Sequence, residues 1–161
     1  MNLSNNSKIW IFQSTRNFNS EEINEIEQVL DIFMKEWNAH GAKLTAAYAL
    51  PYDRFIVLAV DENVEPASGC SIDSMTRIIK ALEEKHQFGL LNRMLVSYKL
   101  HDEITTISLP EFKQKLRNNE ISEEATVFHN GLTSLNEFDL HWELPLRESW
   151  AKSFLPAGME E

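Results

Sequence analysis

The sequence predicts an α+β fold: a ferredoxin-like split β-α-β-β-α-β core with an extra strand and a helical C-terminal appendage. Two observations predict it. Two amphipathic helical patterns alternate with β-prone runs, and two pairs of runs are joined by connections short enough to require antiparallel hairpins. The 161 residues fit one domain. We expect a single domain over 1–161, with its core at 8–109, an α/β appendage at 110–155 and a frayed tail at 156–161.

The first strand and the first helix have the clearest patterns. Residues 8–14 are β-branched and aromatic, which is typical of a strand. Ser20 then precedes a segment in which apolar residues recur every three or four positions from Ile23 to Trp37, so we expect an amphipathic helix with a serine cap. Gly41 is the expected left-handed residue at its end.

A hairpin follows the first helix. Pro51-Tyr52-Asp53 separates two β-prone runs, 44–50 and 54–60, and proline and aspartate favour a turn there. The second run is almost entirely apolar, as a strand buried on both faces would be. A parallel, flavodoxin-like sheet is disfavoured because tight hairpins pair strands antiparallel.

The second helix and second hairpin complete the predicted core. Apolar spacing indicates a helix that opens at Ser71 and ends near Gly89. Residues 94–100 and 103–109 then form a hairpin about His101-Asp102. This last pair supplies the final strand of the β-α-β-β-α-β order and the extra one.

The last third carries two capping-box matches, at Ser108 and Ser134, each followed three residues later by glutamate. A short strand is expected at 126–128, and Pro145 interrupts the second helix. The string 139–143 holds aspartate, histidine and glutamate, but helical spacing turns the histidine away from the acids. We therefore expect a solvated face there and no metal site.

Composition excludes several classes of protein. The net charge of −10 disfavours nucleic acid as a partner, and no cluster of basic residues offsets it. The longest apolar run, Phe55–Val60, is far short of a membrane span, and no signal peptide is visible, so we expect a cytoplasmic protein. The single cysteine excludes intramolecular disulfides and multi-cysteine zinc sites. No cofactor or metal is indicated.

Motifs for nucleotide and hydrolytic chemistry are absent. None of the five glycines is followed by lysine, so no P-loop can cradle phosphates, and G-x-G-x-x-G is missing too. G-x-S-x-G and H-E-x-x-H do not occur. An ATPase is therefore not expected.

One corner of the predicted fold gathers chemistry-bearing residues. Cys70 precedes Ser71, the expected cap of the second helix, where helix amides can activate a thiol, although free cysteine is more often a packed, inert residue. In a split βαβ unit the second helix starts at the end of the sheet where the first helix finishes. The stretch 37–41, the loop 61–69 and the turn at His101 are therefore expected at the same end as Cys70. We hypothesise a thiol–imidazole pair of Cys70 with His40 or His101. The candidate site residues are Cys70, His40, His101, Asp61 and Asp73.

Several strings along nearly the whole chain resemble a family of uncharacterised bacterial proteins of about this length, whose members are often labelled "ABC transporter ATPase". The resemblance implies no activity, and the missing P-loop and LSGGQ-like signature give that label no support. The matching strings are Trp10-Ile11-Phe12-Gln13-Ser14, Trp37-x-x-His40-Gly41, Asp53-Arg54-Phe55-Ile56, Val60-Asp61-Glu62, Gly69-Cys70-Ser71-Ile72-Asp73 and Trp142-Glu143-x-Pro145-Leu146-x-x-Ser149-Trp150.

Two functions remain open. The first is a non-catalytic binding or interaction module that associates with itself, its aromatic C-terminal segment completing a core or an interface. The alternative is a small-molecule enzyme or thiol-dependent sensor that works at the Cys70 corner.

Overall fold

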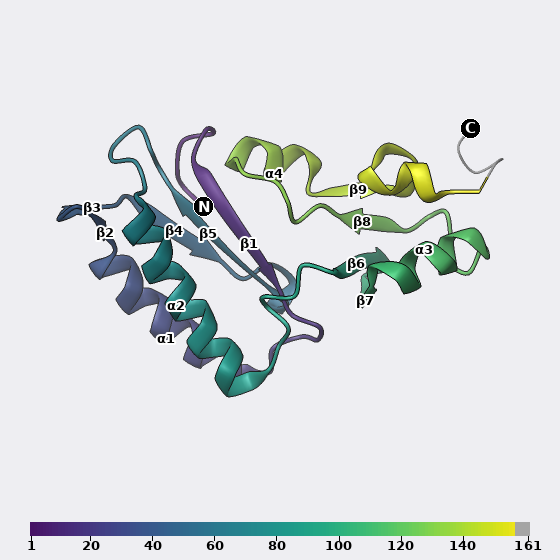
Figure 1. Cartoon of the computed structure of the whole chain (residues 1–161), viewed down its shortest axis with the longest axis horizontal. Coiled ribbons are helices and arrows are strands. Elements are labelled where there is room, and N and C mark those ends of the chain that lie inside the picture. The colour runs from purple at the N-terminus through teal and green to yellow at the C-terminus, as the bar shows by residue number, and fades with distance from the viewer. Residues whose placement is uncertain (157–161) are drawn as a thin grey trace. The chain divides into compact units, whose positions relative to one another are not determined.

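The protein is an α+β chain of two compact units, seen in a computed structural model that describes residues 1–156 (Figure 1). Unit 1 comprises Met1–Leu91 and Leu132–Phe138; unit 2 comprises Asn92–Gly131 and the segment from Asp139 onward. All strand pairs given below are antiparallel, including the two hairpins that the short connections predict. Most of the predicted frayed tail, 157–161, lies outside the described residues.

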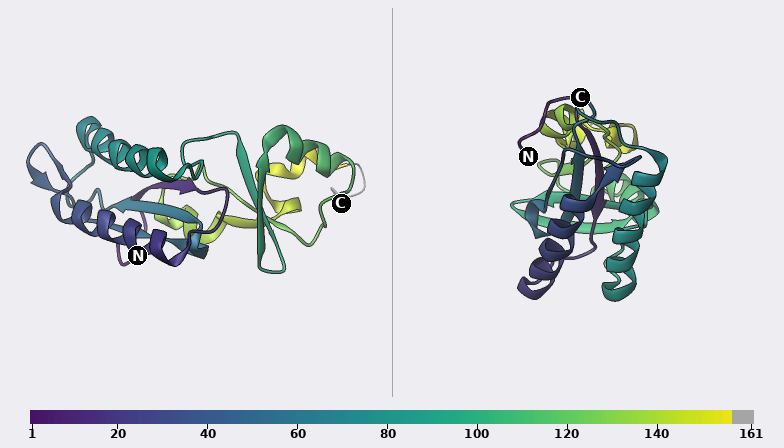
Figure 2. Two further views of the ribbon diagram at one scale, coloured as in Figure 1. Left: turned by 90° about the horizontal axis from the view of Figure 1, so that it is seen from below. Right: turned by 90° about the vertical axis from the view of Figure 1, so that its left-hand side faces the viewer.

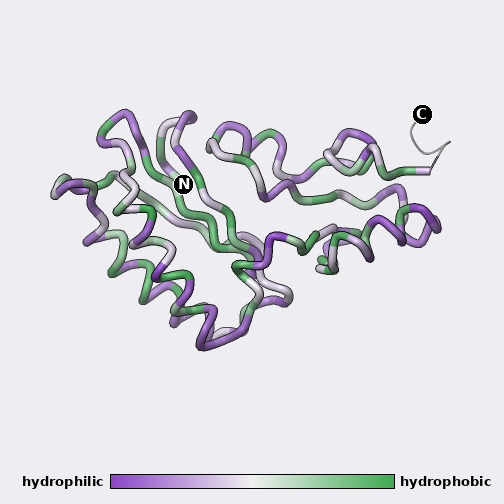
Figure 3. Tube along the Cα trace, in the orientation of Figure 1, coloured by the Kyte–Doolittle hydropathy of each residue, from purple (hydrophilic) through white to green (hydrophobic). Residues whose placement is uncertain are grey.

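Unit 1 is a three-stranded sheet covered by two helices. The sheet has the order β1-β5-β4, and its elements are β1 (Lys8–Gln13), α1 (Ser20–Glu36), β4 (Ala46–Ala49), β5 (Phe55–Val60) and α2 (Gly69–His86). Every residue of β5 is buried, which confirms that the apolar run forms a central strand. Figure 3 shows this strand as a continuous hydrophobic stretch.

Both helices lie on the same side of that sheet (Figure 2, right). Leu30 of α1 and Ile79 of α2 are fully buried in one cluster with Ile56 and Leu58 of β5. At the far end of α1, the Trp37 indole N–H donates to the backbone oxygen of Ser71 at 2.8 Å, inside the protein. The helical stripes read from the sequence therefore do face a common core.

The end of α1 differs from the prediction. The helix stops at Glu36, and the chain forms a small hairpin of β2 (Asn38–Ala39) and β3 (Ala42–Lys43). His40 and Gly41 make its turn with positive φ angles of 52° and 82°. Gly41 thus supplies a left-handed residue, as its sequence position suggests, but to a hairpin and not to a helix end.

A short segment that returns late in the sequence lies beside β1. Lys8 forms an isolated antiparallel bridge with Ser134, and the Ile9 N–H donates to the Thr133 oxygen at 3.0 Å. A residue range far along the chain thus extends the edge of the first sheet.

Unit 2 contains a four-stranded sheet with the order β7-β6-β8-β9. Its core gathers Phe112 and Leu116 of α3, Val127 of β8 and Ala151 of the last 3₁₀ turn. Its elements are β6 (Leu95–Leu100), β7 (Glu103–Ser108), α3 (Leu109–Arg117), β8 (Thr126–Phe128), β9 (Glu143–Pro145) and the 3₁₀ turns η2 (Leu146–Glu148) and η3 (Trp150–Phe154); α4 (Leu135–His141) begins in unit 1 and ends in unit 2.

This second sheet corrects the predicted topology. The hairpin of β6 and β7 exists, but it pairs with β8 and not with β1, so a ferredoxin-like order running through residue 109 is not confirmed. Spacing in the sequence reports which runs are strands and which neighbours form hairpins; it does not report long-range partners. Among residues 1–156 no helix is long and apolar enough to cross a membrane.

Candidate functional site

Cys70 is exposed in the first turn of α2, not in the position before its cap. The cap is Ser68, and the helix begins two residues earlier than predicted. The Ser71 N–H donates to Ser68 Oγ at 3.1 Å, and the Ser68 N–H donates to Ser71 Oγ at 2.7 Å. Ser71 is therefore the second half of a capping box, and its hydroxyl is hydrogen-bonded to the backbone of Ser68.

The two candidate histidines lie at hairpin tips. His40 belongs to the β2–β3 turn of unit 1, and His101 to the β6–β7 turn of unit 2. In residues 1–156 no hydrogen bond joins the Cys70 thiol to either imidazole; its backbone oxygen accepts one from Ser74 Oγ. The thiol–imidazole pair stays a prediction.

The candidate acids hold loops or face solvent. Asp61 accepts hydrogen bonds from the backbone N–H groups of Ser4 and Asn63, at 3.4 and 3.1 Å. Asp73 is exposed on α2. Within the described part of the chain, no group of three His, Cys, Asp or Glu side chains could hold a metal ion. The candidate residues of unit 1 therefore form no metal-binding group and no hydrogen-bonded pair with the Cys70 thiol within residues 1–91.

The string 139–143 also differs from its prediction. Asp139 and His141 are helical in α4, whereas Glu143 starts β9 and pairs with Lys99 at 2.5 Å. The predicted helical stripe therefore ends at His141, and the glutamate serves an ion pair within the sheet.

A dense ionic network lies at the other end of unit 1, where α1 begins and α2 ends. The guanidinium of Arg16 donates to both carboxylate oxygens of Glu22, at 2.8 and 2.7 Å. Glu22 is also the third residue of a capping box, receiving the Asn19 N–H at 2.9 Å. These hydrogen bonds, the one from Arg16 foremost, lower the pKa of Glu22 to about 2 against the opposing effect of burial.

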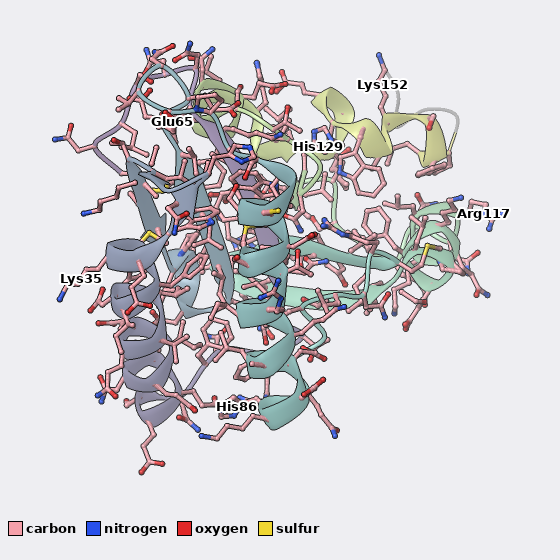
Figure 4. All side chains as sticks on the ribbon, turned by 60° about the vertical axis from the view of Figure 1, so that its left-hand side comes forward. Lys35, Glu65, His86, Arg117, His129 and Lys152 are labelled. Carbon is pink, nitrogen blue, oxygen red and sulfur yellow. The ribbon has the colours of Figure 1, made fainter. Side chains whose placement is uncertain are left out.

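His86 joins the two helices within this network (Figure 4). Its Nε2 lies 2.5 Å from a Glu25 oxygen, and its Nδ1 lies 3.6 Å from a Glu22 oxygen. The ring stacks on Phe88 with centroids 4.8 Å apart. Hydrogen bonds from Lys85 and His86 lower the pKa of Glu25. Because these charged groups are paired with one another, the network holds structure and leaves no ionic group to receive a ligand.

Unit 2 has a hollow of about 430 Å³ between α3 and η3. The α3 residues of this hollow follow Phe112 and Leu116, the buried pair of the helix, by one position each, so they lie on the flank of its buried stripe. The Lys113 ammonium sits 4.6 Å from the centroid of the Phe154 ring, within cation–π range. The side chains that line the hollow are Lys113, Arg117, Ser153, Phe154 and Leu155.

The two cations of this hollow lack the ion pair that some other cations of the described chain form. Over residues 1–156, neither Lys113 nor Arg117 lies within ion-pair distance of a carboxylate, whereas Arg147 is held by Glu123 at 2.6 Å. Figure 4 shows Arg117 at the end of α3. Two available cations beside an aromatic ring and an aliphatic side chain can attract an anion and cover its apolar part. Sequence reasoning missed this site; its only local signal is a basic pair four residues apart.

A second hollow in unit 2, of about 260 Å³, contains one predicted residue, His101. The carboxylates of Glu103 and Glu120 line it with the hydroxyl groups of Tyr98 and Thr105. His101 itself is mostly exposed, and its Nε2 lies 3.8 Å from Glu124. This hollow has two acidic residues in its lining and a smaller volume than the first.

Comparison of this chain with protein-family models, with curated proteins and with solved structures finds no match. The resemblance to the uncharacterised bacterial family stays a prediction, and the function has to be argued from the side chains themselves.

Proposed function

We propose that this protein is a binding module whose ligand site is the hollow between α3 and η3. The observation that carries the proposal is the coincidence of free volume, an aromatic wall and two cations that have no carboxylate partner among residues 1–156. Ligand sites typically combine an apolar lining with a few convergent polar groups, and 430 Å³ lies within their usual range of about 300–1,000 Å³.

The lining favours binding over catalysis. Lysine and arginine at a solvent-open hollow attract and orient an anion, and Phe154 and Leu155 exclude water from its apolar part. The alternative, an enzyme or thiol sensor at Cys70, gains no supporting contact from the residues around that thiol. ATPase activity is not part of the proposal, because the sequence lacks the P-loop.

Trp150 provides the test of this proposal. Its indole is partly exposed and packs edge-on against Phe154 with ring centroids 6.2 Å apart. In protein labelled with 5-fluorotryptophan, 4-phenylbutyrate and its neutral amide are titrated while the fluorine spectrum is recorded. Saturable movement of the Trp150 resonance, assigned by Trp150→Phe, supports the site. If neither compound moves it, the proposal is wrong.

Three further properties belong to the same proposal. Unit 1 would be ferredoxin-like by itself: the order β1-β5-β4 with both helices on one face supports this, and the segment at Ser134 beside β1 would take the place of the fourth strand. An exposed, unpaired thiol at Cys70 suits the reducing cytoplasm. Self-association is tested by light scattering on the purified chain.

A further inference from the structure

We infer that the hollow between α3 and η3 recognises a small organic monocarboxylate whose carboxylate meets Lys113 and Arg117 and whose apolar end packs on Phe154 and Leu155. This inference rests on the proposed function and names the class of its ligand.

The positive charges of Lys113 and Arg117 are the first reason to expect a carboxylate. Arg117 presents a planar fork of N–H donors that matches the two oxygens of a carboxylate, and Lys113 stands one helical turn before it on α3. Neither cation is satisfied by a carboxylate of the described chain. A ligand carboxylate would therefore complete both without displacing a partner that belongs to residues 1–156.

The position of Arg117 on α3 affects which ligand charge is favoured. Arg117 is the last residue of α3, at the negative end of the helix dipole. The whole chain adds a net charge of −10. These fields oppose a second negative charge on the ligand, whereas Lys113 and Arg117 attract it, and the phosphonate probe below measures which effect is larger.

The apolar side chains select the rest of the ligand. Leu155 is 5% exposed and belongs to the core of unit 2, so it forms a fixed wall. Phe154 is half-buried, held edge-on by Trp150 and covered on part of its surface by Lys113. A short aryl or alkyl chain fits this wall.

The experiment compares three matched probes on the full chain: 4-phenylbutyrate, 4-phenylbutyramide and 3-phenylpropylphosphonate at pH 8. Dissociation constants come from the Trp150 fluorine shift and from calorimetry. We expect the carboxylate to bind at least tenfold more tightly than the amide and more tightly than the dianionic phosphonate. Added salt should weaken the binding of the carboxylate and leave the binding of the amide unchanged.

Variants assign the effect to the two cations. Arg117→Gln is expected to weaken carboxylate binding about tenfold, and Lys113→Gln several-fold, with little change for the amide. Lys115→Gln removes the same charge from the same helix at a residue that does not line the hollow, so it is the matched control. Circular dichroism melts establish that each variant is folded.

The outcomes separate the two proposals. Equal binding of amide and carboxylate, or tighter binding of the phosphonate, overturns the ligand class while the binding site stands. Equal losses in Lys115→Gln and Arg117→Gln also overturn it, because long-range charge alone would then explain the preference. Silence of the Trp150 resonance with every probe overturns the proposed function itself.

Discussion

The two units of this protein use charged groups in opposite ways. In unit 1, Arg16, Glu22, Glu25, Lys85 and His86 neutralise one another at the meeting of α1 and α2. In unit 2, Lys113 and Arg117 have no carboxylate partner among residues 1–156. Paired charges in a partly buried site stabilise a fold, whereas unpaired charges beside free volume are available to a ligand.

A large pKa shift does not by itself mark a functional site in this protein. The most strongly shifted carboxyl pKa, that of Glu22, belongs to the structural network and not to the proposed site. Perturbed pKa values mark functional sites only as a tendency, because structural ion pairs shift them by the same physics. The following predictions test the contrast between the two regions.

Replacing Glu22 should produce the largest loss of stability. Glu22→Gln keeps an acceptor for the Asn19 N–H but removes the charge that Arg16 holds, in a side chain only 9% exposed. We expect the free energy of unfolding to fall by about 2 kcal/mol, measured by urea denaturation at pH 7. Glu21→Gln, an exposed neighbour in the same first turn, is the control and should cost under about 1 kcal/mol.

The contribution of Glu22 should also disappear in acid. Its pKa is lowered from 4.5 to about 2 in the folded protein, so its stabilising effect is complete above pH 4.5 and is lost as the pH falls toward 2. The stability gap between the wild-type protein and Glu22→Gln should therefore close across that window, as seen in urea midpoints at pH 7, 4 and 3. A gap that stays constant would show that the Glu22 charge is not what the variant removes.

The elements of the fold followed from local patterns, and their long-range partners did not. The stripe from Ile26 to Phe33 and the apolar run of β5 identify a helix and a central strand, because period and burial are local properties. Ser108 and Ser134 accept the backbone N–H groups of Glu111 and Glu137, as their capping boxes predict. The second sheet was missed because β6 pairs with β8, a strand that follows only after β7 and α3, and local patterns do not report such a partner.

The candidate site shows the same limit more sharply. The usual capping box has glutamate or glutamine three residues after the cap, but Ser68 has Ser71 at that position, so the motif does not identify Ser68 as the cap. With Ser71 taken as the cap, Cys70 falls outside the predicted helix. The hollow of unit 2 joins Lys113 to Phe154 across about forty residues, and no spacing rule connects them. Cys70 is exposed, whereas the sequence favoured a packed cysteine, because the exposure of a side chain depends on tertiary contacts that local patterns do not report.

Removing the cations of unit 2 should cost little stability. Lys113→Gln with Arg117→Gln deletes one cation–π contact and one favourable charge at a helix C-terminus, but no ion pair of residues 1–156. We expect a loss below about 1 kcal/mol in the same urea experiment, clearly less than for Glu22→Gln. A loss as large as that of Glu22→Gln would mean that these cations hold the fold, and the contrast between the two regions would collapse.

The smallest effect is expected at Cys70. Its side chain is exposed, and its thiol makes no hydrogen bond to His40 or His101 in the described chain, so Cys70→Ser should change stability by less than about 0.5 kcal/mol. Iodoacetamide at pH 7.5 should alkylate Cys70 within a few-fold of the rate for N-acetylcysteine, followed by mass spectrometry. Reaction more than tenfold faster would restore the thiol-sensor alternative. If the fast alkylation of Cys70 were then lost in His40→Gln, His40 would be identified as the base. An imidazole that activates the thiol must lie within hydrogen-bond reach of the sulfur.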